Sequence, residues 1–230
     1  MKVYEIEVKC FLLKDIKISE ASSKICVFID GELAKDPELL ELHNKNTYKN
    51  YCFNSFYPLE QNKIYKQDKI YTFQIRTIDK KLANVFLNNL KNRYTDEIKG
   101  LTTSIRIIPQ KPIEKLYSIS PAIMKTENGY WKNNISLSEF ERHLNENLIK
   151  KYNLIMDTKI DEKFQLYTTL EFMNKKPVTL EYKGIKLLGD KICMQIDSNK
   201  TAQDIAYMAI GTGVLEVNAR GAGYVNYRLL

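Results

Sequence analysis

Hydrophobic and polar residues alternate at the start of the chain, where Ile6, Val8 and Cys10 are separated by charged positions. A period of two is typical of a half-buried strand. Farther along, apolar residues recur at helical spacing in two places, and aromatic, extended segments lie between them. In chain order, the pattern predicts a strand (2–13), a helix (19–35), strands (51–57 and 63–78), a helix from Asp79 and a strand (101–108).

Prolines divide this first half of the chain. We expect Asp36-Pro37 to end the first helix, because proline cannot continue the helical hydrogen-bond ladder. A short turn and a polar bend over residues 43–50 then lead to the aromatic strand. Two prolines within 109–112 predict a short linker.

The same order of elements follows the linker. The pattern predicts a strand (113–126), a helix (136–152) that starts at the capping box Ser136-x-x-Glu139, strands (163–173 and 178–196), a helix that starts at a second capping box, Thr201-x-x-Asp204, and a last strand. Strand, helix, strand, strand, helix, strand is the ferredoxin-like order. We therefore predict an α+β protein of two tandem ferredoxin-like (RRM-like, β-α-β-β-α-β) domains, over residues 1–109 and 113–230.

Glycines gather near the C-terminal end, in the pairs Gly211/Gly213 and Gly221/Gly223. Glycine permits positive φ and close approach, and consecutive bare N–H groups can form an anion-binding nest. Arg220 stands beside the second pair, and its guanidinium suits phosphate. The spacing fits neither a P-loop nor a dinucleotide fingerprint. The alternative is a long connection whose glycines only relieve strain.

The net charge of +7 favours a polyanionic partner. Both halves carry a similar small excess of Lys and Arg, so any basic groove must be assembled from both. The protein has 44% hydrophobic residues and 27% charged residues, which is typical of an ordinary globular protein and not of a disordered one.

Three further features argue against a secreted, a membrane-spanning or a metal-binding protein. The four cysteines form no C-x-x-C pair, which predicts reduced, buried side chains and no zinc site. The N-terminus lacks an apolar signal core, and no run approaches the ~18 apolar residues of a membrane span. We expect a cytosolic protein without a membrane partner. No Asp, Glu or His cluster has metal-ligand spacing, so we expect no metal or cofactor.

The chain has two histidines, and each allows two interpretations. His43 lies in the polar bend with Lys49 six residues later. A histidine transfers protons near neutral pH and a lysine stabilises charge on phosphate, although a lone loop histidine is commonly a surface residue. His143 follows Arg142 on the predicted helix. That pair indicates either a solvated helix face or a face that contacts RNA.

Three features together resemble the CRISPR-associated endoribonucleases that process repeat RNA, within the RAMP superfamily. These are the tandem ferredoxin-like order, the segment 42-LHNKNTYKNYCFNSF-56, and a helix of the AYMAIGTG type that leads to a terminal glycine-rich loop and one last strand. They cover nearly the whole chain.

The resemblance implies metal-independent cleavage of precursor CRISPR RNA within its repeats, by attack of a ribose 2′-OH on the adjacent phosphate. The products would carry a 2′,3′-cyclic phosphate and a 5′-OH. His43 would be the general acid/base and Lys49 would stabilise the phosphorane. Family members often place a tyrosine in the first helix, where this chain has Phe28, so Tyr48 is the candidate hydroxyl.

The expected partner is repeat RNA, bound by a monomer or homodimer. The residues expected to bind it are Gly211, Gly213, Arg220, Gly221, Gly223, Arg142 and His143. A second hypothesis is a non-catalytic RNA-binding subunit of a CRISPR effector complex, which would share the fold without the cut. A third, a small-molecule enzyme of ferredoxin-like fold, has no cofactor motif to support it.

Overall fold

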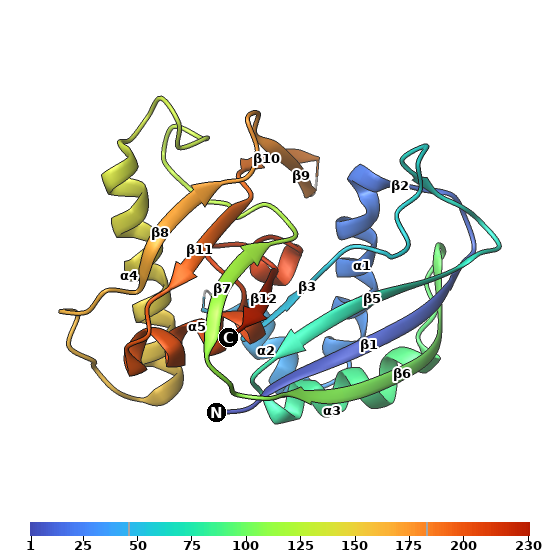
Figure 1. The fold of residues 1–230 in the computed structure, drawn as a ribbon. Coiled ribbons are helices and arrows are strands. Elements are labelled where there is room, and N and C mark those ends of the chain that lie inside the picture. The colour runs from blue at the N-terminus through green and yellow to red at the C-terminus, as the bar shows by residue number, and fades with distance from the viewer. Residues whose placement is uncertain (46, 183) are drawn as a thin grey trace.

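The computed structural model describes residues 1–45, 47–182 and 184–230. Two four-stranded antiparallel sheets lie side by side, each with helices packed against it, and the last strand lies near the junction (Figure 1). The first sheet and its helices, residues 1–108, are called the N-terminal unit below. Residues 113–230 are called the C-terminal unit. That these units are separate domains, divided at 109–112, stays a prediction.

The N-terminal unit has the expected order with two short additions. Its elements are β1 (Val3–Leu12), β2 (Ile16–Lys17), α1 (Ile18–Leu33), α2 (Pro37–Asn44), β3 (Tyr51–Phe53), β4 (Ile64–Tyr65), β5 (Ile70–Thr77), α3 (Lys80–Asn89), the 3-10 turn η1 (Leu90–Asn92) and β6 (Ile98–Ile108). The main sheet has the order β3-β5-β1-β6, and β2 pairs with β4 separately. Phe28 of α1 and Phe86 of α3 are fully buried in its core.

The C-terminal unit repeats this plan. Its elements are β7 (Ile113–Ser118), α4 (Leu137–Met156), β8 (Tyr167–Phe172), β9 (Val178–Tyr182), β10 (Ile185–Gly189), β11 (Ile192–Ile196), α5 (Lys200–Thr212), the 3-10 turn η2 (Asn218–Arg220) and β12 (Val225–Leu229). The sheet order β12-β7-β11-β8 is again ferredoxin-like, and β9 and β10 form a hairpin outside it. The α+β class and the tandem ferredoxin-like fold are confirmed.

The first helix ends at Leu33, ahead of Asp36-Pro37 as expected, but the short turn predicted next is wrong, because Asp36 and Pro37 begin the helix α2. The Asp36 carboxylate accepts hydrogen bonds from the N–H groups of Glu38 and Leu39, and Pro37 occupies the first turn, where its missing N–H costs nothing. The backbone of His43 therefore belongs to the last turn of α2 and not to a bend.

The two predicted capping boxes have different outcomes. Ser136 caps α4: its hydroxyl accepts from the Glu139 N–H, and the Glu139 carboxylate accepts from the Ser136 N–H. The second box is wrong, because α5 begins two residues earlier. Asn199 is its N-cap, and the Asn199 side chain accepts from the Ala202 N–H.

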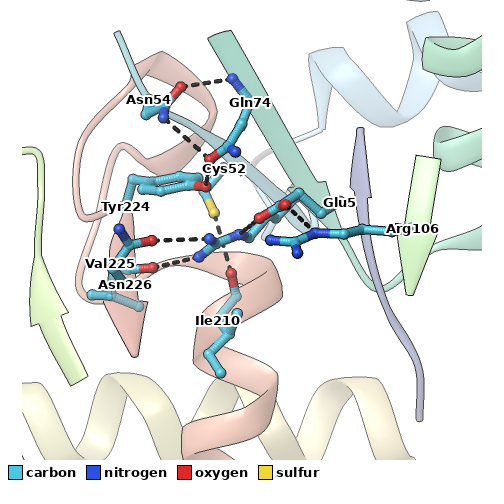
Figure 2. Close-up of polar contacts among 10 residues, drawn as sticks. Glu5, Cys52, Asn54, Gln74, Arg106, Ile210, Tyr224, Val225 and Asn226 are labelled. Carbon is cyan, nitrogen blue, oxygen red and sulfur yellow. Dashed lines mark hydrogen bonds and ion pairs between the residues drawn. The ribbon is translucent and has the colours of Figure 1, made fainter. Parts of the chain in front are cut away.

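A buried polar network joins the two units. Arg76 of β5 donates to Glu5 at 2.7 Å, to the Val225 carbonyl at 2.6 Å and to Asn226 at 2.9 Å. Figure 2 shows Glu5 and Arg106 on one side of the network and Tyr224, Val225 and Asn226 on the other. Burial opposes ionisation of Glu5, but the charges and hydrogen bonds of Arg76 and Arg106 outweigh it and hold the pKa of its carboxyl below the ordinary value.

All four cysteines are free, and Cys10, Cys26 and Cys52 are buried as predicted, whereas Cys193 is partly exposed. Burial raises the pKa of the Cys10, Cys26 and Cys52 thiols to about 12. No helix among the described residues combines the length and the apolar character that crossing a membrane requires.

Candidate functional site

A cleft of about 900 Å³ lies where the units meet. The N-terminal unit contributes residues 47–51, and the C-terminal unit contributes α4, β10 and the loop before β12. Its described lining is Thr47, Tyr48, Lys49, Asn50, Tyr51, Lys125, Lys151, Leu154, Ile185, Leu187, Thr212, Leu215, Glu216, Val217, Asn218, Ala219 and Arg220. The cleft therefore brings one predicted catalytic segment against the predicted glycine loop.

Lys49 is held by the end of α2. Its ammonium donates to the Leu42 carbonyl at 2.7 Å and to the Lys45 carbonyl at 2.5 Å. Carbonyls at a helix C-terminus carry partial negative charge, which favours a cation there. Burial lowers the pKa of Lys49, and the nearby charge of Arg220 lowers it further. Lys49 thus lies where the last turn of α2, which contains the His43 backbone, meets the cleft.

Of the other two predicted catalytic residues, Tyr48 has a described side chain and His43 does not. The side chain of His43 lies outside the described residues, so its proposed role rests on the sequence. Tyr48 lines the cleft, and its ring centroid is 5.3 Å from the Lys151 ammonium. Burial raises the pKa of the Tyr48 hydroxyl, so at neutral pH this group is protonated and can donate a hydrogen bond.

The four glycines stand where the backbone has a close neighbour or a positive φ. Gly211 belongs to the last turn of α5, where a Cβ would lie 2.8 Å from Ile78 and 3.2 Å from Val3. Gly213, Gly221 and Gly223 have φ of 77°, 92° and 63°, which other residues rarely adopt. The helix, glycine loop and final strand are confirmed, except that Gly211 is helical.

The anion nest is not formed by these glycines. The N–H of Gly213 donates to the Ala209 carbonyl, that of Gly221 to Asn218 and that of Gly223 to Pro121. A backbone N–H that already has a carbonyl partner is not free for phosphate. The other hypothesis, that the glycines permit a strained and closely packed connection, fits this geometry.

Arg220 links the glycine loop to the N-terminal unit. Its guanidinium forms an ion pair with Asp30 of α1 and a hydrogen bond with the Cys26 sulfur at 2.6 Å. The side chain is 20% exposed. Its contact with RNA stays a prediction, and its observed contacts hold the loop against α1.

Arg142 and His143, the pair predicted to contact RNA from α4, have different surroundings. Arg142 is exposed and pairs with Glu146 one turn later, as on a solvated helix face. His143 points to the glycine loop, with its Nε2 atom 2.6 Å from a Glu216 carboxylate oxygen. Glu216 also accepts from the Lys125 N–H at 2.6 Å. Within the described residues, His143 contacts a cleft residue and Arg142 pairs with its own helix.

Sequence reasoning missed Lys151, which is 1% exposed in the floor of the cleft. Its ammonium donates to the Gly213 carbonyl at 3.0 Å, the Leu215 carbonyl at 3.4 Å and the Asn218 amide oxygen at 2.9 Å. A signal existed, because Lys151 follows Leu144 and Leu148 at helical spacing and so lies on the apolar face of α4.

Within the described residues, no three His, Cys, Asp or Glu side chains gather in a way that could hold a metal ion.

Residues 108–227, just over half of the chain, match the family described as CRISPR associated protein Cas6, C-terminal. A sequence comparison with curated proteins finds no match.

Several solved structures share the whole fold at low identity. One described as an RAMP protein binding different RNA substrates has a TM-score of 0.74 and 17% identity, and the match covers 98% of this chain and 99% of that one. A CRISPR associated protein Cas6 has a TM-score of 0.70 and 19% identity, with 98% and 99% covered. The product of a Cas6-related gene from Pyrococcus furiosus has a TM-score of 0.70 and 18% identity, with 98% of each chain covered. The chain therefore belongs to the Cas6 family of CRISPR-associated proteins, a membership that supports a role in binding or processing CRISPR RNA.

Proposed function

We propose that this protein is a metal-independent endoribonuclease that cleaves precursor CRISPR RNA within its repeats, in the cleft between the units. The observation that carries the proposal is the convergence of the Lys49 segment, from one unit, and the glycine loop, from the other, on one cleft. Neither unit has this site alone.

The charge of the cleft suits a phosphate backbone. Three partly or fully exposed cations line the cleft, namely Lys49, Lys125 and Arg220, and Glu216 is the carboxylate among the described lining residues. An excess of positive charge in a cleft attracts a polyanion. Similar solved structures include one described as an RAMP protein binding different RNA substrates and one described as a Cas6 product complex, which supports RNA as the ligand.

The proposed reaction needs two proton transfers and charge stabilisation. A base removes the proton of the 2′-OH, the 2′-oxygen forms a bond to phosphorus, the bond to the 5′-oxygen breaks, and an acid protonates that oxygen. His43 acts as general acid/base, a role worth about 10²–10⁴-fold in rate. Lys49 stabilises the phosphorane oxygens, and Tyr48 donates a hydrogen bond from its protonated hydroxyl.

Single-turnover cleavage of repeat RNA in EDTA tests this proposal. We expect the wild type to give a 2′,3′-cyclic phosphate and a 5′-OH. His43→Ala lowers the rate constant by about 10²–10⁴-fold, and Lys49→Ala by roughly 10²–10³-fold. Lys45→Ala is the matched control, because this exposed lysine pairs only with Glu41 among the described residues. Equal rates for wild type and His43→Ala would remove His43 from the mechanism.

The second candidate function is a non-catalytic RNA-binding subunit of a CRISPR effector complex. Phe28 favours it, because this side chain is fully buried and offers no hydroxyl from α1. Tight binding of repeat RNA without cleavage by the wild type would support this candidate and overturn the nuclease.

A further inference from the structure

Lys151 is a buried cation whose bonds all go to the glycine loop. All three ammonium hydrogens are used, because the group donates to Gly213, Leu215 and Asn218. With 1% of its surface exposed, it has neither room nor a free hydrogen for a phosphate. Its charge therefore acts on the protein itself.

Asn218 completes the arrangement from inside the loop. Its amide oxygen accepts from Lys151, and its amide nitrogen donates to the Val214 carbonyl at 2.9 Å and the Ala222 carbonyl at 3.2 Å. Together, Lys151 and Asn218 satisfy four backbone carbonyls of the loop, and they are called the Lys151–Asn218 clamp below.

The clamp explains two of the glycines. A Cβ on Gly213 would lie 2.6 Å from the Asn218 amide nitrogen, and a Cβ on Gly223 would lie 2.7 Å from the same atom. Both contacts are shorter than real Cβ atoms permit. The chain packs closely around the Asn218 amide at both positions, and the φ of 77° at Gly213 and of 63° at Gly223 also favours glycine.

The loop that the clamp holds is strained. Leu215 and Val217 have φ of 54° and 63°, a left-handed conformation that is unfavourable for bulky and β-branched side chains. Such backbone persists only where the surrounding contacts over-determine it. The clamp supplies those contacts at both ends of the segment, between Gly213 and Ala222.

The same ammonium reaches the N-terminal unit. It lies 5.3 Å from the centroid of the Tyr48 ring, within the range of a cation–π contact. Tyr48 immediately precedes Lys49, which is tied in turn to the last turn of α2. One buried cation thus contacts both the glycine loop and the segment proposed to carry the chemistry.

We propose that Lys151 is a positioning residue, which holds the strained glycine loop through the Lys151–Asn218 clamp and aligns the Tyr48–Lys49 segment against it. This role rests on the proposed nuclease function. Lys151 touches no RNA in this role, so its loss slows the cleavage step and leaves RNA affinity nearly unchanged.

The test compares Lys151→Met with Lys150→Met. Methionine keeps most of the length of the side chain and removes the ammonium, while Lys150 is an exposed neighbour on the same helix that pairs with Glu146. We expect Lys151→Met to lower the single-turnover rate constant by roughly 10²-fold, as a small misplacement of catalytic groups does, with the Kd for repeat RNA within about threefold of wild type. Lys150→Met leaves the rate constant unchanged.

Hydrogen exchange provides an arm that does not depend on cleavage. We expect the amides of Val214, Glu216 and Gly223 to exchange faster in Lys151→Met, because their hydrogen bonds depend on the position of the clamped loop. The amides of α3, which lies in the N-terminal unit and contains no residue of the clamped loop, should not change. If the wild type binds RNA without cutting it, the nuclease proposal fails, and this arm still decides whether the clamp exists. If Lys151→Met does not fold, Asn218→Ala breaks the clamp from the other side and carries the same expectations.

Three results would overturn the proposal. A fall in RNA affinity as large as the fall in rate would make Lys151 an RNA contact. An unchanged rate constant would remove it from the reaction. Unchanged exchange in the loop would show that the clamp does not hold it.

Discussion

Two cations are buried where the units meet, and their partners differ. Arg76 is paired with the Glu5 carboxylate at 2.7 Å, and both side chains are less than 5% exposed. Lys151 is equally buried, but in the described part of the chain its ammonium meets only carbonyl and amide oxygens and an aromatic ring. The first charge is compensated by an opposite charge, and the second is solvated by dipoles.

The difference indicates different uses of the interface. A compensated pair that also bonds β12 ties the two sheets together. No carboxylate contacts the Lys151 ammonium among the described residues, and burial, opposed in part by the more distant charge of Glu216, lowers the pKa of Lys151 to about 8. The network around Arg76 stabilises the contact between the two sheets, whereas we propose that Lys151 positions the residues of the cleft.

Arg76→Leu gives the largest expected effect on stability. Glu5 would stay buried with Arg106 as its remaining cation, and the hydrogen bonds to Val225 and Asn226 would be lost. Removing one partner of a buried pair costs about 3–5 kcal/mol. Urea denaturation measures the free energy of unfolding directly.

Arg106→Leu is the matched control. It removes a second guanidinium from the same carboxylate, but the Arg106 side chain is 65% exposed. An exposed ion pair is worth about 1 kcal/mol or less. Equal losses for the two variants would contradict the contrast between buried compensation and surface pairing.

The next largest effect that we expect is a pH dependence of the free energy of unfolding that comes from Lys151. Burial lowers its pKa to about 8, whereas the unfolded chain keeps the ordinary value near 10.5. Between these values the unfolded state binds more protons, so the free energy of unfolding rises with pH, by about 1.4 kcal/mol per unit and roughly 3 kcal/mol in all.

Urea denaturation from pH 7 to 10.5 measures the free energy of unfolding of the wild type and of Lys151→Met. The difference between the two values at each pH cancels the contributions of the other titrating groups. Below pH 8 the difference should be flat. A difference that stays flat from pH 8 to 10.5 would mean that an opposite charge keeps the ammonium protonated, as Glu5 compensates Arg76, and would contradict the contrast between the two cations.

Gly223→Ala tests the packing of the clamp with a smaller effect. A Cβ there would lie 2.1 Å from the Val214 carbonyl oxygen, and φ is 63°. Left-handed backbone costs about 1–2 kcal/mol for a non-glycine residue, and overpacking adds about 1 kcal/mol or more. Thermal denaturation of Gly129→Ala gives the control, because Gly129 has φ of 91° but nothing lies within 4 Å of the place that its Cβ would occupy. Losses of the same size at both positions would mean that the clamp tolerates a methyl group.

Local signals in the sequence predicted much of the fold, because they act within a few residues. The Ser136 capping box, the strand at 101–108 and the helix after Asp79 all formed as expected. A local signal can also have two consequences, of which only one was predicted. The first helix ends before Asp36-Pro37, and the Asp36 carboxylate then caps α2, where a turn was predicted. Asn199 likewise caps α5 ahead of the predicted Thr201.

Periodicity, charge and glycine content are properties of neighbouring residues or of the whole chain, and from them the sequence predicts two ferredoxin-like units, a basic protein and a glycine-rich end. What those glycines and cations do depends on contacts that form only in the folded protein. Arg220 meets Asp30 across 190 positions and His143 meets Glu216 across 73, and no local pattern contains such pairs. The glycine N–H groups predicted to hold phosphate instead donate to carbonyls of α5, of the loop and of the segment after β7, because a buried backbone must satisfy its hydrogen bonds within the protein.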